Sequence, residues 1–152
     1  MAAHDSSDWI PGLRALLSSQ PLGVLSTHDR GRPHASLVAF AASKDLREIL
    51  FATPRTTRKY TYLIEDPRSA LLVDNRSNTP ADFHHAMAAT ARGTVEEIGH
   101  EDKERFLSPY LARHPHLSDF VRVPSCALMR LRVESYSIVR RFQEVVEVPV
   151  PP

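Results

Sequence analysis

The feature that most constrains the fold is the segment 50–75, LFATPRTTRKYTYLIEDPRSALLVDN, which has the pattern of strand, tight turn, helix and strand. Pro54 follows the apolar end of the first strand, and Thr56 or Thr57 can cap the helix that comes next. Pro67 ends this helix. Its apolar residues recur at spacings of three and four, which predicts one buried face made of Tyr60, Leu63 and Ile64. The segment therefore predicts a short helix inserted between two strands.

The charges at the start of this helix are not those that a helix start favours. The first turn of a helix carries unpaired N–H groups and a partial positive charge, so it favours Asp and Glu. Arg58 and Lys59 occupy it here. A bound anion would remove the repulsion, and N–H groups, Thr hydroxyls, a guanidinium and an ammonium together suit a phosphate monoester. The alternative is that both cations are solvated surface charges, with Arg58 paired to Glu65 or Asp66. The pattern alone leaves both interpretations open.

The rest of the chain predicts further short strands separated by turn residues. Strands are expected at 22–27, at 34–42, in a segment ending at Thr53, and at 69–73, 88–98, 125–139 and 140–148. The segment 28–33 has the chemistry of a hairpin turn, in which Gly31 can adopt positive φ. Gly93 predicts a bulge or a close backbone approach in the middle of its strand. In the strand 125–139 the inner face is expected to carry Ala127, Met129, Leu131 and Val133.

Helices are expected at fewer places. Asp8 can cap a helix whose buried face carries Trp9, Leu13, Leu16 and Leu17. A second helix is expected at 101–113, where Pro109 can kink or split it, and a short turn at 117–120. The segment 75–87 is expected to be a loop. This succession predicts a mainly β fold with peripheral α-helices, a six- to seven-stranded antiparallel barrel with helices packed on its outside.

Length and composition bound the organisation of the chain. The 152 residues predict a single domain over 1–152, with 1–7 and 148–152 flexible. Lys+Arg 19 against Asp+Glu 18 gives a net charge of +1, so no field for nucleic acid or an anionic membrane is expected. The lone Cys126 excludes an internal disulfide and is expected to be a small core residue. With no signal peptide and no apolar run of about 20 residues, a cytoplasmic protein is expected.

Taken in order and at their spacing, these motifs resemble the pyridoxamine 5'-phosphate oxidase-like, FMN-binding split β-barrel family. PLGVLSTHDRGRPHASLVAFA is similar to the first hairpin of that family. LFATPRTTRKYTYLIEDPRSALLV resembles its aromatic-rich strand, its Ser/Thr-Arg-Lys helix start and its Asp/Asn-Pro-Arg step, and ATARGTVEEI resembles its Gly-centred strand. YLARHPHLSDF and the strand after it look like the branch that contains haem-utilisation proteins. The likeness covers nearly the whole chain and implies a split barrel.

The resemblance also implies a cofactor and a site. The cofactor is FMN, and the residues that the family pattern assigns to it are Ser36, Leu37, Val38, Ala52, Thr53, Thr57, Arg58 and Lys59. The first three would line the flavin, largely through backbone groups, and the next two would lie along its ribityl chain or ring. The last three would hold its phosphate, at the helix start that the charge pattern also indicates. Family members are homodimers with the flavin at the subunit interface, so a homodimer is expected.

The function expected from the resemblance is that of a flavin-dependent oxidoreductase of unknown substrate. The alternatives are a non-catalytic flavin-binding module for storage or sensing, and the same barrel binding a deazaflavin or haem. The vitamin B6 oxidase has an Arg-x-His signature near its C-terminus, which RRFQEVVEVPVPP lacks, so that substrate is not expected. A Gln that reaches the flavin in the oxidase falls on Ala88, and RRFQ at 140–143 replaces the Gly-rich step of the haem branch. No general base stands out, so no catalytic residue is assigned.

Other polar residues have simpler interpretations. No metal site is expected at His84 and His85, because neighbouring histidines on an extended segment point to opposite sides and no ligand set completes them. For His34, a turn-exposed position is favoured over a pocket position. For Arg130 and Arg132, which alternate on one strand face, a solvated face or a dimer contact is favoured over an acidic ligand.

Overall fold

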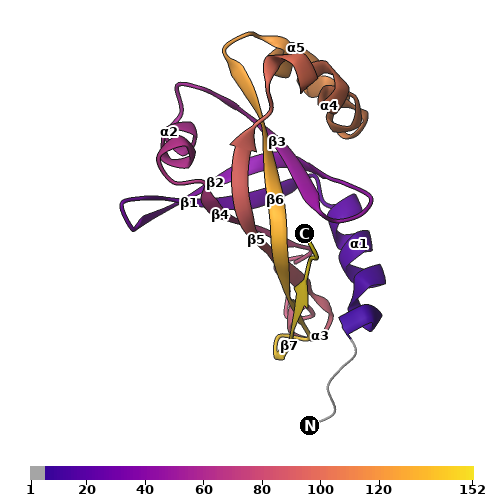
Figure 1. Cartoon of the computed structure of the whole chain (residues 1–152). Coiled ribbons are helices and arrows are strands. Elements are labelled where there is room, and N and C mark those ends of the chain that lie inside the picture. Colours follow the sequence, from indigo (N-terminus) through magenta and orange to yellow (C-terminus); the bar gives the residue numbers. More distant parts are fainter. Residues whose placement is uncertain (1–5) are drawn as a thin grey trace.

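The computed structural model describes residues 6–152, and seven antiparallel strands form the body of this part of the chain (Figure 1). They are β1 (Leu22–Asp29), β2 (Arg32–Ala42), β3 (Glu48–Pro54), β4 (Arg68–Asp74), β5 (Met87–Glu97), β6 (Cys126–Arg140) and β7 (Glu144–Pro149). Neighbours follow the order β3-β2-β1-β4-β5-β6-β7, and a further pairing of β3 with β6 closes six strands into a barrel. β7 lies outside this ring, on β6. The mainly β antiparallel barrel predicted from the sequence is confirmed.

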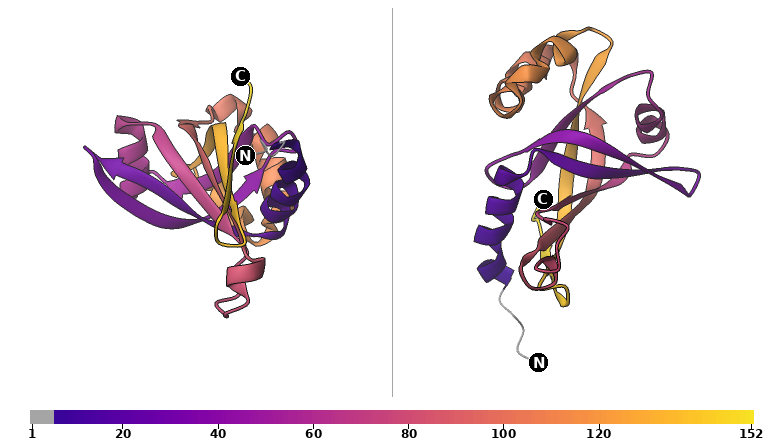
Figure 2. Two further views of the ribbon diagram at one scale, coloured as in Figure 1. Left: turned by 90° about the horizontal axis from the view of Figure 1, so that it is seen from below. Right: turned by 180° about the vertical axis from the view of Figure 1, so that it is seen from behind.

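Short helices surround the barrel. They are the 3₁₀ turn η1 (Ser6–Trp9), α1 (Ile10–Ser19), α2 (Arg58–Glu65), α3 (Asp82–His85), α4 (His100–Arg113), the 3₁₀ turn η2 (Pro115–Leu117) and α5 (Ser118–Arg122). Helix α1 lies along one side of the barrel, α2 lies on the opposite side, and α4 and α5 sit together at one end (Figures 1 and 2). Within residues 6–152, none of these helices has the length and apolar character that crossing a membrane requires.

Most buried apolar side chains form one cluster inside the barrel and beneath α1. The predicted inner residues of β6 and the predicted face of α1 belong to it: Trp9, Leu13, Leu16, Leu17, Ala127, Met129, Leu131 and Val133. A second, smaller cluster lies between α4, α5 and the outer face of the barrel, where Leu50 and Leu128 meet Leu107, Tyr110 and Val121. Because helices cover the outer face here, the first half of β6 is apolar on both sides.

Two backbone features follow from glycine. Arg30 and Gly31 connect β1 to β2, and both have positive φ, of 50° and 87°, as a two-residue hairpin turn requires. At Gly93 the register between β5 and β6 shifts, which confirms the predicted bulge. A Cβ atom at this position would lie 1.8 Å from the carbonyl oxygen of Arg132, so the strands can approach only because residue 93 has no side chain.

Some local predictions are wrong. Ile64 is 60% exposed, although it was expected on the buried face of α2, because the eight-residue helix directs Leu63 into the core and leaves the adjacent position in solvent. The predicted loop 75–87 contains the short helix α3, since the Asp82 carboxylate accepts hydrogen bonds from the N–H groups of Ser77 and Asn78 and folds the loop back. Asp8 lies inside η1 and does not cap α1.

Helix α4 and the last strand also differ from the prediction. Pro109 does not split α4, which runs unbroken with Leu107 and Tyr110 buried on either side of the proline. The last strand begins at Glu144, later than expected, because Arg141 and Phe142 turn the chain with positive φ. The expected flexibility of 1–7 falls mostly on residues 1–5, which lie outside the described part of the chain, and Ser6 begins η1. The expected flexibility of 148–152 stays a prediction, although Val148 is buried within β7.

We expect Gly93→Ala to destabilise the protein by about 1–3 kcal/mol or more, because the strand pair must separate to admit the methyl group. Urea unfolding monitored by circular dichroism measures this loss. The matched control is Gly99→Ala, where a Cβ would have no neighbour within 4 Å. This control should change the free energy of unfolding by less than about 1 kcal/mol. Equal stability of both variants would contradict the close approach at Gly93.

Candidate functional site

The start of α2 is built by Thr57, which confirms one of the two predicted caps. Thr57 has an extended backbone, and its Oγ1 accepts a hydrogen bond from the Tyr60 N–H at 3.3 Å. The same hydroxyl lies 2.7 Å from Oγ1 of the fully buried Thr53 and donates to the Pro54 carbonyl at 3.0 Å. Thr56 is exposed and takes no part in the cap. The end of β3 thus sets the position and direction of the helix.

Two cations stand at this helix start without partners. The first turn of α2 contains no acidic residue. Within residues 6–152, neither Arg58 nor Lys59 forms a hydrogen bond or an ion pair through its side chain, whereas nearby Arg55 pairs with Glu97. Lys59 is half-buried, and this burial lowers the pKa of its ammonium group. A helix start with two uncompensated cations is a strong site for an anion.

The alternative pairing of Arg58 with Glu65 or Asp66 is wrong. Asp66 instead accepts hydrogen bonds from Arg68, the shorter at 2.6 Å, and lies 3.0 Å from Nε2 of His28. The hydrogen bonds from Arg68 hold the pKa of Asp66 well below its usual range. Asp66 follows the C-terminal end of α2 and is already paired with Arg68. It therefore does not compensate the two cations at the N-terminal end of the helix.

The barrel is split beside this helix start. β2 pairs with β3 only from Phe40 to Ala42, whereas β3 continues to Pro54 along β6. In the described structure, β2 before Phe40 therefore has β1 on one edge and no strand on the other. If the register of β2 and β3 is continued, Val38 lies across from Thr53 and residue 36 lies across from the turn that leads into α2. The open edge can offer backbone N–H and C=O groups to a ligand.

Buried hydroxyl groups on the inner face of the same strands have no partner. Ser36 Oγ and Thr27 Oγ1 are both buried and form no hydrogen bond within the described residues. A buried hydroxyl left unpaired costs about 1–3 kcal/mol, so such groups usually have a ligand or a water as partner. Sequence reasoning assigned Ser36 and missed Thr27, which is 3% exposed. An inward-facing Thr in an apolar strand was the signal that could have identified it.

The eight predicted cofactor residues fall into three groups in the structure. Thr53, Thr57, Arg58 and Lys59 come together at the β3–α2 turn. Ser36 and Val38 face inward on β2. Leu37 is 68% exposed on the outer face, and Ala52 packs against the cluster under α4 and α5. The side chains of the eight residues therefore do not share one surface. A ligand that lies along the open edge of β2 would meet the backbone of Leu37, and the family resemblance implies a backbone contact there.

A polar network that sequence reasoning missed fixes the β3–α2 turn. The Tyr60 hydroxyl donates to Glu97 Oε1 at 2.6 Å, and Arg55 binds both carboxylate oxygens of Glu97. Arg55 also donates to the Pro124 carbonyl at 2.6 Å. The hydrogen bond from Arg55 is the main reason that the pKa of Glu97 is lowered. These partners are far apart in the sequence, so no local pattern indicates the network.

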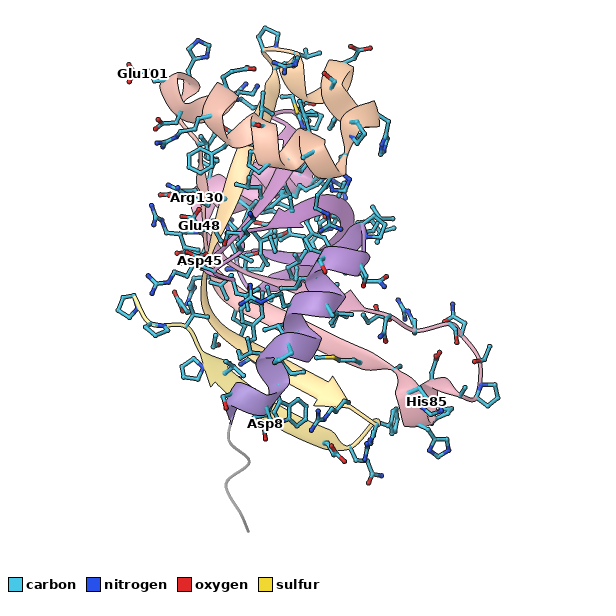
Figure 3. All side chains as sticks on the ribbon, turned by 90° about the vertical axis from the view of Figure 1, so that its right-hand side faces the viewer. Asp8, Asp45, Glu48, His85, Glu101 and Arg130 are labelled. Carbon is cyan, nitrogen blue, oxygen red and sulfur yellow. The ribbon has the colours of Figure 1, made fainter. Side chains whose placement is uncertain are left out.

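The remaining candidates have structural surroundings. Arg130 pairs with Glu48 and Glu96, and Arg132 pairs with Glu96 at 2.8 Å, so the two arginines are already neutralised. Figure 3 shows Arg130 and Glu48 together on one side of the barrel. His34 is half-buried and meets the Tyr62 ring edge-on, with 5.7 Å between the ring centres.

Metal and thiol chemistry find little support in the described residues. His84 and His85 are exposed on α3, and residues 6–152 hold no group of three or more His, Cys, Asp or Glu side chains placed to bind a metal ion. Cys126 is buried as a free thiol, which confirms its predicted core position, and burial raises the pKa of its thiol. A thiol with a raised pKa is a poor nucleophile at neutral pH.

Comparison with known families agrees with this fold. The family model of pyridoxamine 5'-phosphate oxidase matches residues 11–140. The match covers most of the chain, and the closed antiparallel barrel is consistent with it, so the chain belongs to this family. No curated protein sequence matches the chain significantly.

Several solved structures share the fold. The haem-binding protein from Mycobacterium smegmatis is 17% identical with a TM-score of 0.79, and the match covers 90% of this chain but 55% of that protein. A FAD-binding protein from Mesorhizobium loti is 17% identical with a TM-score of 0.68, and 85% and 90% of the two chains are covered. A protein from Clostridium acetobutylicum related to general stress protein 26 is 14% identical with a TM-score of 0.73, and 94% and 95% are covered. The chain thus spans little more than half the length of the mycobacterial protein, and identities this low show the shared fold alone.

We expect Thr57→Ala to lower the free energy of unfolding by about 0.5–2 kcal/mol, because it removes the cap of α2. The neighbouring Thr56→Ala is the matched control and should have little effect, since Thr56 is exposed. Urea unfolding of both variants measures the difference. A larger loss for Thr56→Ala than for Thr57→Ala would contradict the assignment of the cap.

Proposed function

We propose that this protein binds FMN, with the phosphate at the start of α2, and acts as a flavin-dependent oxidoreductase. The observation that carries the proposal is the pair Arg58 and Lys59, unpartnered among residues 6–152 at a helix start without acidic residues. The chain supplies a guanidinium, a half-buried ammonium and the N–H groups of the first turn, and this donor set fits a phosphate dianion. Each charge-assisted hydrogen bond would contribute about 1.5–3 kcal/mol to binding.

The other residues of the site would orient the cofactor. The isoalloxazine ring of FMN supplies the redox chemistry when it is bound. The backbone of β2 at Ser36, Leu37 and Val38 would offer hydrogen bonds along its open edge, and the unpaired Ser36 hydroxyl would gain a partner. Thr53 would hold Thr57 in place beneath the phosphate, and Ala52 would lie beside the same turn.

The relatives support a flavin and leave other ligands as alternatives. The family takes its name from pyridoxamine 5'-phosphate oxidase, and the sequence resemblance implies FMN binding for it. One structural neighbour is named a FAD-binding protein. FMN is preferred because it ends in a phosphate monoester, which fits a single helix start. Haem, which the mycobacterial neighbour is named for binding, would place carboxylates at the two cations. A deazaflavin would use the same site, and so would a flavin that is held for storage or sensing. Turnover of an electron donor and an electron acceptor distinguishes an enzyme from a binding module.

We propose further that the protein is a homodimer with the flavin at the subunit interface. On the outer face of the barrel, Leu37 lies opposite Val24, and Val24 lies opposite Leu72. Both leucines are exposed, and a second row on this face runs through Ala88 and Val139. Exposed apolar side chains that share one face of a sheet can form an interface. A second copy of the chain would cover it and close the flavin site.

The single cysteine fits a reducing compartment such as the cytoplasm.

We expect Arg58→Ala to weaken FMN binding about 10- to 100-fold, because it removes a charge-assisted hydrogen bond to the phosphate. Riboflavin has no phosphate, so its affinity should change much less. Titration followed by flavin fluorescence measures both. Arg105→Ala on α4 is the control and should leave both affinities unchanged, because Arg105 is exposed and paired with Asp102. Equal losses for FMN and riboflavin would refute the phosphate assignment.

We expect Leu37→Asp to convert the dimer to a monomer, because it places a charge at the most exposed apolar residue of this face. Sedimentation velocity at several concentrations measures the oligomeric state. Phe120→Asp changes an exposed apolar residue of α5, on a different part of the molecule, and should leave the dimer intact. A wild-type protein that stays monomeric, or a Leu37→Asp variant that stays dimeric, would overturn the proposed interface.

A further inference from the structure

A second potential site lies between the β3–α2 turn, the end of β5 and the helices α4 and α5. It is a cleft of about 420 Å³, a volume within the range of small-molecule sites, about 300–1,000 Å³. None of the eight predicted flavin residues lines it. Its apolar wall consists of Ile98, Leu107 and Leu128, which belong to the second apolar cluster. These three side chains are almost fully buried, so they form the floor of the cleft, and the exposed Pro124 adds apolar surface at its rim.

Two of the three cations that line the cleft are already neutralised. Arg55 binds both oxygens of Glu97 at 3.3 and 2.9 Å, and Arg122 binds both oxygens of Glu104 at 2.9 Å. Both arginines are thus paired with a carboxylate, which leaves little charge for a ligand. They do not favour a ligand with several negative charges.

Lys103 is the third cation, and it has no carboxylate partner within residues 6–152. Its Nζ donates one hydrogen bond, to the Cys126 carbonyl at 2.7 Å, and its side chain is partly buried. An ammonium group has three N–H donors, so two remain for another acceptor. The carbonyl holds the group at the cleft. Glu97, which lines the same cleft and is bound to Arg55, attracts Lys103 without pairing with it directly. A half-buried cation beside an apolar wall favours a ligand with one negative charge and an apolar body.

We propose that this cleft binds a small organic monoanion, such as a carboxylate on an apolar chain or ring. Lys103 holds the charged end, and Pro124 and the aliphatic stem of Lys103 contact the apolar body above a floor of buried side chains. The site differs in charge from the start of α2, where two free cations and the helix N–H groups suit a phosphate dianion. The inference does not depend on flavin binding, because no residue of the predicted flavin site contributes to the cleft.

The test uses the full chain and 3-phenylpropionate as the probe, followed by amide chemical shifts in ¹⁵N–¹H NMR spectra. We expect saturable binding, with the largest shifts at residues that line the cleft. 3-Phenylpropionamide has the same apolar body without the charge, and acetate has the charge without the body. Each should bind at least about tenfold more weakly, because each loses one half of the recognition. Equal affinity for the acid and its amide, no saturable binding, or shifts at Arg58 and Lys59 instead would overturn the proposal.

Variants at two of the three lysines of the chain complete the test. Lys103→Met keeps the aliphatic stem and removes the charge, so it should weaken 3-phenylpropionate binding at least about tenfold. Lys103→Arg keeps a cation and should retain most of the affinity, which separates loss of charge from loss of structure. Lys44→Met is the matched control and should bind as the wild type does. Wild-type affinity in a folded Lys103→Met variant would overturn the proposal.

Discussion

The structure depends on how the two edges of β3 are paired. Along one edge β3 pairs with β6 over its full length, from Glu48 opposite Arg132 to Pro54 opposite Cys126. Along the other edge it pairs with β2 only from Phe40 to Ala42. The first ladder closes the barrel, and the second ends early enough to leave part of β2 without a neighbour. An unpaired edge exposes backbone donors and acceptors, which proteins usually cover or use. The start of α2 stands where the two strands separate.

The helix start and the split support each other physically. Thr57 caps α2 only because Thr53 and Pro54, at the end of β3, hold its hydroxyl. Arg55 and Glu97 tie the same turn to β5, so the unpaired cations of α2 project from a fixed frame. A binding site that is held in place before its ligand arrives loses less freedom on binding. Arg55 also borders the cleft under α4 and α5, so this one turn separates the proposed flavin site from the proposed anion site.

Sequence reasoning predicted the parts of the structure that local patterns determine. The alternation of Ala127, Met129 and Leu131 identified the inner face of β6, and Arg58 and Lys59 stood out because they contradict the preference of a helix start. It failed where a contact depends on residues far apart in the chain. The exposure of Ile64 depends on how the barrel receives α2, and the Arg55–Glu97 pair joins residues on different strands and turns. The split itself has no local signature, because strand length does not reveal where a ladder ends.

The most direct test of the flavin site is the visible absorption spectrum of the purified protein, recorded alone, with added FMN and with added riboflavin. We expect a bound flavin spectrum, and affinity at least about tenfold higher for FMN than for riboflavin, because Arg58 and Lys59 are proposed to bind the phosphate. Equal affinity for the two flavins would contradict the phosphate site at the start of α2. A protein that binds neither flavin would contradict the proposed cofactor, and a Soret band with added haem would then assign the barrel to haem.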